Sequence, residues 1–210
     1  NFRILYLNMK IVAIIQARMG STRLENKVMK TINNIPMIEL LLKRLSKSKL
    51  IDKIIVATSK DKKNLSLINH VEKIGFICER GSEKDVLERY LQVAENNLAD
   101  IIVRITGDCP LVDPIIVDKC IKKFIGSNVD YCSNVNPPTF PDGLDVEVIK
   151  FSALKKASKE SKTKFEREHV TPYIISSEKF SKINFTNDQD LSSFRWTVDD
   201  PEDFEVIKNV

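Results

Sequence analysis

Short apolar runs alternate along the first half of the chain with segments whose apolar residues recur at helical spacing. Apolar runs of this length, bounded by turn signals, are typical of parallel strands covered on both faces. They predict strands at residues 10–16, 52–59, 76–80 and 100–106. The segments between them carry apolar stripes and predict helices at residues 36–48, 61–75 and 82–98.

Several helix ends are marked by capping residues. Ser82 is expected to cap one helix, with Asp85 as its box partner three residues later, and Asp113 is expected to cap the helix that follows Pro114. Near the C-terminus, Asp200 is expected as an N-cap with proline at the first helical position.

Strict alternation of strands and helices with short connections predicts βαβ units and a mostly parallel sheet. The pattern becomes irregular after residue 126. Strand-like segments occur at 129–134 and 144–149, a polar helix follows, and then two short strands, one of them at 194–198, precede a last helix. We expect a single α/β domain over residues 9–210, with residues 1–8 as an N-terminal extension before Met9.

Composition narrows the possible partners. The chain has 210 residues, 42% of them hydrophobic, and a net charge of only +4, which is too weak to indicate nucleic acid. No apolar run reaches the ~18–20 residues of a membrane span, so no membrane partner is expected. Four cysteines without a CxxC pair and two histidines argue against zinc and favour a cytoplasmic location.

Ligands of open α/β sheets bind outside the carboxyl ends of the strands. Three loops follow predicted strands with charged or small residues: "QARMGSTRLENK", "ERGSEKD" and "TGDCPLVDP". We expect these loops to converge at one edge of the sheet.

The first loop gathers Arg18, Arg23 and Lys27 around the Gly20-Ser21 turn. Backbone N–H groups of such a turn approach anions closely, and arginine binds phosphate in a bidentate way. Charge-assisted contacts contribute roughly 1.5–3 kcal/mol each, so three cations suffice for a triphosphate. The alternative is a solvated basic loop.

Two aspartates follow strand ends. Asp108, beside a glycine, is either a magnesium ligand or a turn cap, and Asp199 precedes the expected helix cap and is free to hold metal. Two aspartates facing a cationic loop outline a Mg²⁺–phosphate site. Cys109 is expected to be a small buried residue rather than a nucleophile.

The irregular half is expected to supply a sugar pocket. Asn134 offers amide hydrogen bonds, and Asp145 and Glu147 alternate on one strand face, with a solvated strand face as the alternative. His169 is either an acceptor contact or a histidine satisfied within a helix. Phe194 and Trp196 are expected in the core.

Five segments together resemble one family: "QARMGSTRLENK", "RGSEKDVLERY", "RITGDCPLVDP", "REHVTPYI" and "TVDDPEDFEVI". They are similar to the spore coat polysaccharide biosynthesis protein F family, within the wider group of acylneuraminate and 3-deoxy-manno-octulosonate cytidylyltransferases. The match runs in order from about Met9 to the end. The resemblance implies a nucleotide-diphospho-sugar transferase fold, a Rossmann-like three-layer sandwich with a mostly parallel mixed sheet.

The resemblance also implies roles for individual residues. The CTP triphosphate would be held by Arg18, Ser21, Arg23 and Lys27, and Mg²⁺ by Asp108 and Asp199. The base or ribose would lie near Arg80, Gly81 and Ser82. The expected nucleotide site is completed by Ala17, Gly20, Asp85, Thr106 and Gly107, and the expected catalytic residues are Arg18, Lys27 and Asp108. One departure is clear: where the family usually has Pro-Gly before the lysine, this chain has Glu25-Asn26.

These features lead us to expect CTP-dependent nucleotidyl transfer, in which a sugar hydroxyl or sugar phosphate oxygen attacks the α-phosphate. An acidic sugar is the expected acceptor, and relatives suggest a homodimer. Two alternatives stay open: transfer from another nucleotide, such as GTP, to a sugar 1-phosphate, and a nucleotide-binding subunit without catalysis. Glu25-Asn26 favours the last one slightly, and retention of both aspartates argues against it.

Overall fold

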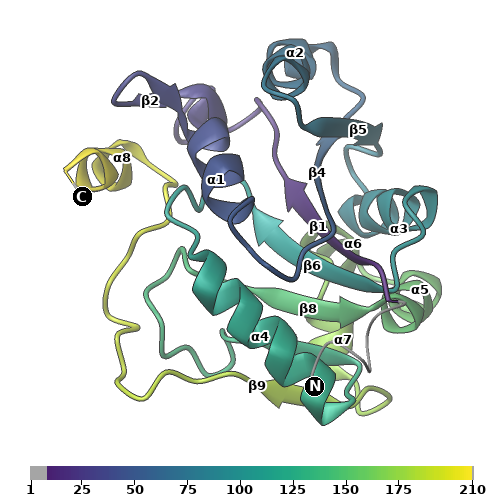
Figure 1. Cartoon of the computed structure of the whole chain (residues 1–210). Helices are drawn as coiled ribbons and strands as arrows, with labels where there is room; N and C mark the ends of the chain where they lie inside the picture. The colour runs from purple at the N-terminus through teal and green to yellow at the C-terminus, as the bar shows by residue number, and fades with distance from the viewer. Residues whose placement is uncertain (1–8, 210) are drawn as a thin grey trace.

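The structure, a computed structural model, describes residues 9–209 and has a seven-stranded sheet at its centre (Figure 1). The strand order is β5-β4-β1-β6-β8-β7-β9. The strands are β1 (Ile11–Gln16), β4 (Lys53–Ser59), β5 (Ile77–Gly81), β6 (Ile101–Thr106), β7 (Tyr131–Ser133), β8 (Glu147–Lys150) and β9 (Lys182–Asn184). The expectation that residues 1–8 form an extension concerns a segment outside the described residues.

The predicted mostly parallel mixed sheet is confirmed. Strands β5, β4, β1 and β6 are parallel, whereas β8 runs antiparallel to both β6 and β7. Strand β1 lies between β4 and β6, and its first five residues are buried, as expected for an apolar run covered on both faces. The reversed direction of β8 brings its amino end to the edge where β1 and β6 end, with Glu147 opposite Arg104.

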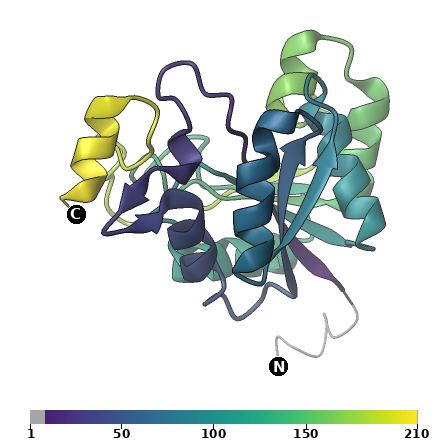
Figure 2. The same cartoon turned by 90° about the horizontal axis from the view of Figure 1, so that it is seen from above.

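Helices cover both faces of the sheet and make three layers (Figures 1 and 2). They are α1 (Met37–Leu45), α2 (Leu65–Lys73), α3 (Val86–Asn96), α4 (Pro114–Ser127), α5 (Phe151–Glu160), α6 (Lys164–His169), α7 (Pro172–Ser176) and α8 (Pro201–Lys208), with short 3-10 turns η1 (Lys27–Met29) and η2 (Lys62–Asn64). One apolar cluster joins the sheet to α1, α2 and α4, and a second joins it to α3, α5 and α7.

A third, smaller apolar cluster holds the C-terminal helix. A two-stranded sheet, β2 (Thr31–Ile32) and β3 (Ile35–Pro36), lies beside α8 (Figure 2). Leu24, Ile32, Met37, Val198 and Ile207 are buried together there. Burial of these side chains brings the last residues of the chain to the segment that follows β1.

Two predicted elements differ from the structure. The helix expected from Ser82 begins at Val86, because the Asp85 side chain, not that of Ser82, accepts a hydrogen bond from the Glu88 N–H and caps it. The Ser82 hydroxyl instead accepts from the Asp85 N–H, 3.0 Å away. The caps expected at Asp113 and Asp200 are confirmed.

The short strand predicted at 194–198 is wrong. Its only ladder contact within residues 9–209 is a single bridge between Arg195 and Asp142. Phe194 is 52% exposed rather than in the core, whereas Trp196 packs partly buried against the third cluster. No helix of the described part of the chain is long and apolar enough to cross a membrane.

Gly143 allows this irregular segment to approach the loop before β8. Its φ of +103° is a conformation that side chains rarely adopt, and an added Cβ would lie 2.4 Å from the backbone nitrogen of Thr197. This close approach allows the Trp196 N–H to donate a hydrogen bond of 2.6 Å to the Asp142 carbonyl.

We expect Gly143→Ala to lower the free energy of unfolding by more than about 2 kcal/mol, since strain and overlap with backbone add together. Gly126→Ala is the matched control: Gly126 lies in α4 with nothing within 4 Å of an added Cβ, so alanine should stabilise by roughly 0.5–1 kcal/mol. Urea unfolding measures both. Equal stability of the two variants would contradict the close packing at Gly143.

Candidate active site at the carboxyl edge of the sheet

The basic loop, residues 17–27, leaves the end of β1 and is fixed at its start by neighbouring elements. The N–H of Met19 donates to Asn64 Oδ1 at 2.8 Å, and Asn64 is itself buried and bonded to Ser59. Asn64 was not among the residues singled out from the sequence, where nothing marks it within the polar run before α2. Its bond sets the direction in which the loop leaves the sheet.

Gly107 brings the loop after β6 against the basic loop. The Gly107 N–H donates to the carbonyl of Gln16 at 2.8 Å, and an added Cβ would lie 2.9 Å from both that carbonyl and the Ala17 Cβ. Only glycine fits this spacing without a shift. Asp108, the next residue, is thereby held close to the basic loop.

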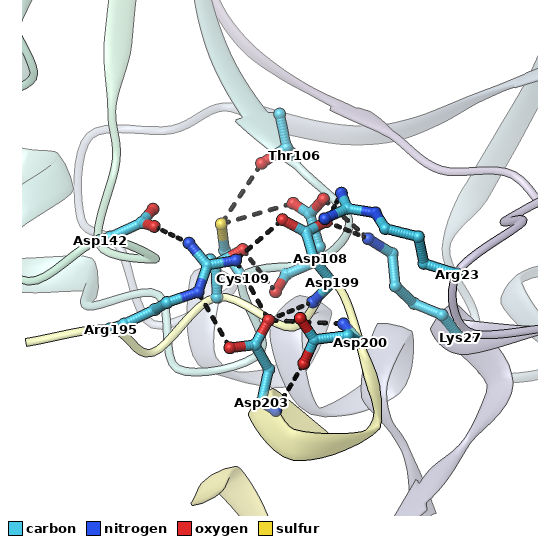
Figure 3. Close-up of polar contacts among 11 residues, drawn as sticks. Arg23, Lys27, Thr106, Asp108, Cys109, Asp142, Arg195, Asp199, Asp200 and Asp203 are labelled. Atoms are coloured by element: carbon cyan, nitrogen blue, oxygen red, sulfur yellow. Dashed lines mark hydrogen bonds and ion pairs between the residues drawn. The ribbon is translucent and has the colours of Figure 1, made fainter.

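Lys27 lies between the two predicted metal ligands (Figure 3). Its Nζ is 3.1 Å from Asp108 Oδ2 and 3.0 Å from Asp199 Oδ1, and its side chain is 12% exposed. Arg23 adds a second contact of 3.0 Å to Asp199 Oδ1 from a more exposed position. Three segments far apart in sequence therefore meet at one ammonium group.

Arg195 holds the other side of Asp199. Its guanidinium donates to Asp199 Oδ2 at 2.9 Å, to both carboxylate oxygens of Asp203, and to Asp142. Asp203 also accepts from the Asp199 N–H at 2.8 Å and shares the helix cap with Asp200 (Figure 3). The Asp199 carboxylate is thus oriented from both sides, and sequence reasoning missed Arg195.

These contacts set the ionisation of the carboxylates. Burial favours a higher pKa for Asp199, but the hydrogen bond and charge of Lys27, with help from Arg195, outweigh it and lower that pKa. The hydrogen bonds of Arg195 likewise lower the pKa of Asp203. Asp199 therefore stays an anion at neutral pH.

A central cavity of about 360 Å³ collects most of the residues predicted from the sequence. Its predicted members are Ala17, Arg18, Gly20, Ser21, Arg23, Lys27, Thr106, Gly107, Asp108, His169 and Asp199. The convergence of the first and third loops is confirmed. Four cations and three carboxylates line this cavity, with Gln16, Arg104 and Glu168 as members that were not predicted.

A second cavity, of about 450 Å³, lies beside α3 and shares Gln16, Arg18 and Glu168 with the central one. Its remaining wall comes from Glu83, Lys84, Val86, Arg89 and Lys164. The predicted residues Arg80, Gly81, Ser82 and Asp85 do not line it. Glu83 and Lys84, which lie between Ser82 and Asp85, line it instead.

Those four residues have other contacts. Gly81 packs against Arg89, whose guanidinium donates to the Ser82 carbonyl. Asp85 caps α3 and pairs with Arg167 at 2.5 Å. Arg80 is exposed at the end of β5. The sequence signal for Arg89 was its place among the buried residues of an amphipathic helix, where an arginine is unusual.

A third cavity, of about 350 Å³, lies beside α7 and shares Arg104, Thr106 and His169 with the central one. Asp145 and Glu147, two of the residues predicted for a sugar pocket, line it. Glu147 is buried and already engaged: it pairs with Arg104 and accepts from the Tyr131 hydroxyl at 2.5 Å. The solvated strand face is therefore wrong for Glu147.

Asn134, also predicted for the sugar pocket, pairs with backbone. Asn134 is 1% exposed, and its amide donates to the Leu144 carbonyl and accepts from the Val146 N–H, each at 2.8 Å. Asn134 thus joins the end of β7 to the loop before β8, and it lines none of the three cavities. His169 is exposed and stacks on Phe165 with ring centroids 4.5 Å apart.

At the Glu25-Asn26 departure, the residue before the lysine has a left-handed backbone. Asn26 has φ 53° and ψ 28°, the left-handed conformation that glycine favours and that asparagine tolerates best among the other residues. Glu25 is exposed, and Lys27 pairs with the two aspartates rather than with it. Glu25 therefore does not compete with these aspartates for Lys27.

The paired aspartates fit a divalent cation. No group of three or more His, Cys, Asp or Glu side chains in residues 9–209 has the arrangement of a metal site. Mg²⁺, however, usually binds one or two carboxylates together with substrate phosphates and water. Asp108 and Asp199 provide that number, and the Lys27 ammonium between them demonstrates that they accommodate positive charge.

Cys109 is buried, as expected, at 2% exposure. Burial and the neighbouring charge of Asp108 raise the pKa of its thiol, so a reactive thiolate is disfavoured.

The protein-family comparison matches residues 12–209 to the family described as Cytidylyltransferase. The chain belongs to this family. The spore coat polysaccharide biosynthesis protein SpsF of Bacillus subtilis is 34% identical over 206 residues, 94% of this chain and 85% of that protein. The resemblance to that family, and assignment as a nucleotidyltransferase, are confirmed.

Solved structures agree with this cytidylyltransferase in fold. A cytidylyltransferase from Leptospira borgpetersenii has a TM-score of 0.92 at 36% identity and covers 96% of this chain and 86% of its own. A CMP:2-keto-3-deoxy-manno-octonic acid synthetase, complexed with CTP, has a TM-score of 0.76 at 16% identity, with 95% and 97% covered. The expected nucleotidyltransferase fold is confirmed.

We expect Asn26→Ala in this cytidylyltransferase to lower the free energy of unfolding by roughly 1–2 kcal/mol, because alanine is strained in the left-handed conformation. Asn26→Gly, the matched variant, should keep the wild-type value or exceed it. Thermal unfolding measures both, and equal loss in the two variants would contradict the conformational explanation.

We expect Arg195→Met to lower stability at neutral pH, and the deficit to shrink as the pH falls below about 4. The sign follows from Asp199 and Asp203: their lowered pKa values stabilise the fold above the unfolded pKa, and this is lost as they protonate. Lys208→Met, which breaks an exposed pair with Glu205, is the control and should change little. A pH-independent deficit would contradict this account.

Proposed function

We propose that the protein transfers the cytidylyl group of CTP to a sugar acceptor and releases pyrophosphate. The observation that carries the proposal is Lys27 between Asp108 and Asp199, in a cavity also lined by Arg18 and Arg23. Family membership favours CTP as the nucleotide. An acidic sugar acceptor and a homodimer, both inferred from the resemblance, belong to the same proposal.

The roles follow from charge and position. Arg18, Arg23 and Lys27 would bind the triphosphate and neutralise the leaving pyrophosphate, because bidentate and ammonium contacts suit phosphate oxygens. The adjoining cavity beside α3 would take the base, and the one beside α7 the acceptor. These groups act by positioning the reactants and stabilising charge, as in phosphoryl transfer generally.

Asp108 and Asp199 would hold Mg²⁺. When bound, this ion supplies Lewis-acid stabilisation of charge on the phosphate oxygens. The bond that forms joins the acceptor oxygen to the α-phosphorus, and the bond that breaks joins that phosphorus to the oxygen of the departing pyrophosphate. Arg18 and Arg23, on the basic loop, would stabilise the negative charge that the pyrophosphate carries away.

Two other functions are separated from this one by a single assay. Pyrophosphate release is measured with Mg²⁺ for CTP, GTP, UTP and ATP, each against acidic eight- and nine-carbon sugars and sugar 1-phosphates. Release with CTP supports the proposal. Release only with GTP and a sugar 1-phosphate would show that the protein is a guanylyltransferase instead. CTP binding without any release would favour a nucleotide-binding subunit without catalysis.

We expect Asp108→Asn to fold normally and to lose turnover by at least on the order of 100-fold, because it removes one of the two carboxylates that would hold Mg²⁺. Circular dichroism checks the fold and pyrophosphate release checks the turnover. Asp188→Asn is the control, since Asp188 is exposed and lies outside the three cavities. Near-normal turnover in Asp108→Asn would refute the assignment of Asp108.

A further inference from the structure

Asp145 lines the cavity beside α7, which adjoins the central cavity. It precedes β8, whose amino end shares the sheet edge with the carboxyl end of β6. The cavity beside α7 that it lines also contains Arg104 and Thr106, and both of these reach the central cavity. Asp145 therefore lies in a cavity that adjoins the proposed phosphate site.

Asp145 differs from the carboxylates around it in having no partner. Asp108 pairs with Lys27, Glu147 with Arg104, and Asp142 and Asp199 pair with Arg195. Asp145 makes no hydrogen bond or ion pair within residues 9–209, although it is half-buried. A half-buried carboxylate without a donor, with other carboxylates near it, is unfavourable for folding, so its presence suggests a reason outside stability.

The surroundings of the Asp145 carboxyl favour its protonated form. Burial, then the negative charges of Asp142, Glu147 and Asp108, raise the pKa of Asp145 from 3.8 to about 7. Arg104 opposes this shift only in part, because its charge is already matched by Glu147. The other titratable group that lines the cavity is His169.

We propose, taking the proposed function as the basis, that Asp145 is the general base that removes the proton from the acceptor hydroxyl. As the hydroxyl oxygen forms its bond to the α-phosphorus of CTP, its proton passes to a carboxylate oxygen of Asp145. The bond from phosphorus to pyrophosphate breaks, the pyrophosphate leaves with the electron pair, and Asp145 later releases the proton to water.

This assignment also selects the acceptor class. A sugar phosphate oxygen is already ionised near neutral pH and needs no base, whereas a sugar hydroxyl must lose a proton as it attacks. A base is most effective when its pKa lies near the working pH, and an ordinary aspartate with a pKa near 4 is a poor one. Asp145 therefore fits a sugar that attacks through a hydroxyl group rather than a sugar 1-phosphate.

His169 is the competing base. It lines both cavities but is exposed and stacked on Phe165. The variants Asp145→Asn and His169→Gln distinguish the two candidate bases. If Asp145 is the base, the ionisation seen in the rate disappears in Asp145→Asn and persists in His169→Gln.

The kinetic experiment follows pyrophosphate release from CTP with Mg²⁺, using 3-deoxy-manno-octulosonate and N-acetylneuraminate as acceptor probes, from pH 5 to 9. Wild-type kcat should rise with pH through about 7 and then level off. Asp145→Asn should lower kcat by roughly 10²-fold or more, lose this ionisation and keep wild-type CTP affinity. Asp145→Glu should recover part of the rate, and Asp188→Asn should match the wild type.

A second measurement does not depend on any acceptor. A carboxyl whose folded pKa is raised destabilises the fold above its unfolded pKa, so Asp145→Asn should melt at a higher temperature than wild type at pH 8. The difference should close as the pH falls to about 4, where Asp145 is protonated in both states.

The outcomes are separable. A wild-type rate and pH profile in Asp145→Asn, or an ionisation that disappears with His169→Gln instead, would overturn the proposal while leaving the cytidylyltransferase function intact. If neither probe supports release, the proposed acceptor fails. The melting experiment still tests the role of Asp145. Equal melting temperatures of wild type and Asp145→Asn at pH 8 would show that the Asp145 carboxylate is not destabilised in the fold, which contradicts the assignment.

Discussion

The contact of Lys27 with Asp108 and Asp199 is the interaction on which the organisation of the site depends. The three residues come from the basic loop, the end of β6 and the start of α8, and 81 and 172 positions separate the lysine from its partners. Both carboxylates lie within 3.1 Å of the Lys27 ammonium group, and two carboxylates this close to one point repel each other unless a cation lies between them. The ammonium group therefore stabilises both the assembled cavity and the position of the C-terminal helix.

The surrounding structure keeps that contact in place through backbone packing. Gly107, one residue past the end of β6, still pairs with Gln16 at the end of β1, so Asp108 follows beside the basic loop. On the opposite side, the Val198 N–H donates to the Asp108 carbonyl at 2.9 Å, which fixes Asp199 one residue later. Arg195 then limits the rotation of the Asp199 side chain.

Carboxylates around the cavities fall into two groups with different physical consequences. Asp199 and Asp203, which pair with Arg195, have lowered pKa values and contribute to the fold at neutral pH. Asp145 has burial and like charges around it but no cation of its own, so it lowers stability and raises its affinity for a proton. Separating carboxylates by environment in this way lets one site hold both fixed charges and a group that exchanges a proton.

The sequence alone determined the parallel half of the sheet, since each strand there is a short apolar run and each connection is a recognisable helix. It also determined the basic loop and both aspartates, because the carboxyl ends of parallel strands share one edge. The caps Asp113 and Asp200 were predictable because capping depends on residues within one turn. The start of α3 was predicted four residues too early, because Ser82 and Asp85 are both suitable N-cap residues and the sequence does not show which one caps the helix.

Only the tertiary structure decided which of these charged residues are engaged. Asp145 and Glu147 look equivalent as alternating strand residues, yet the register places Arg104 opposite Glu147 and leaves Asp145 unpaired. The sequence around Asn134 carries no sign that backbone 10 and 12 residues away would occupy its amide. Likewise, Asn26 becomes equivalent to glycine only through its left-handed backbone. Pairing across distant segments is set by strand register and close packing, which local patterns do not encode.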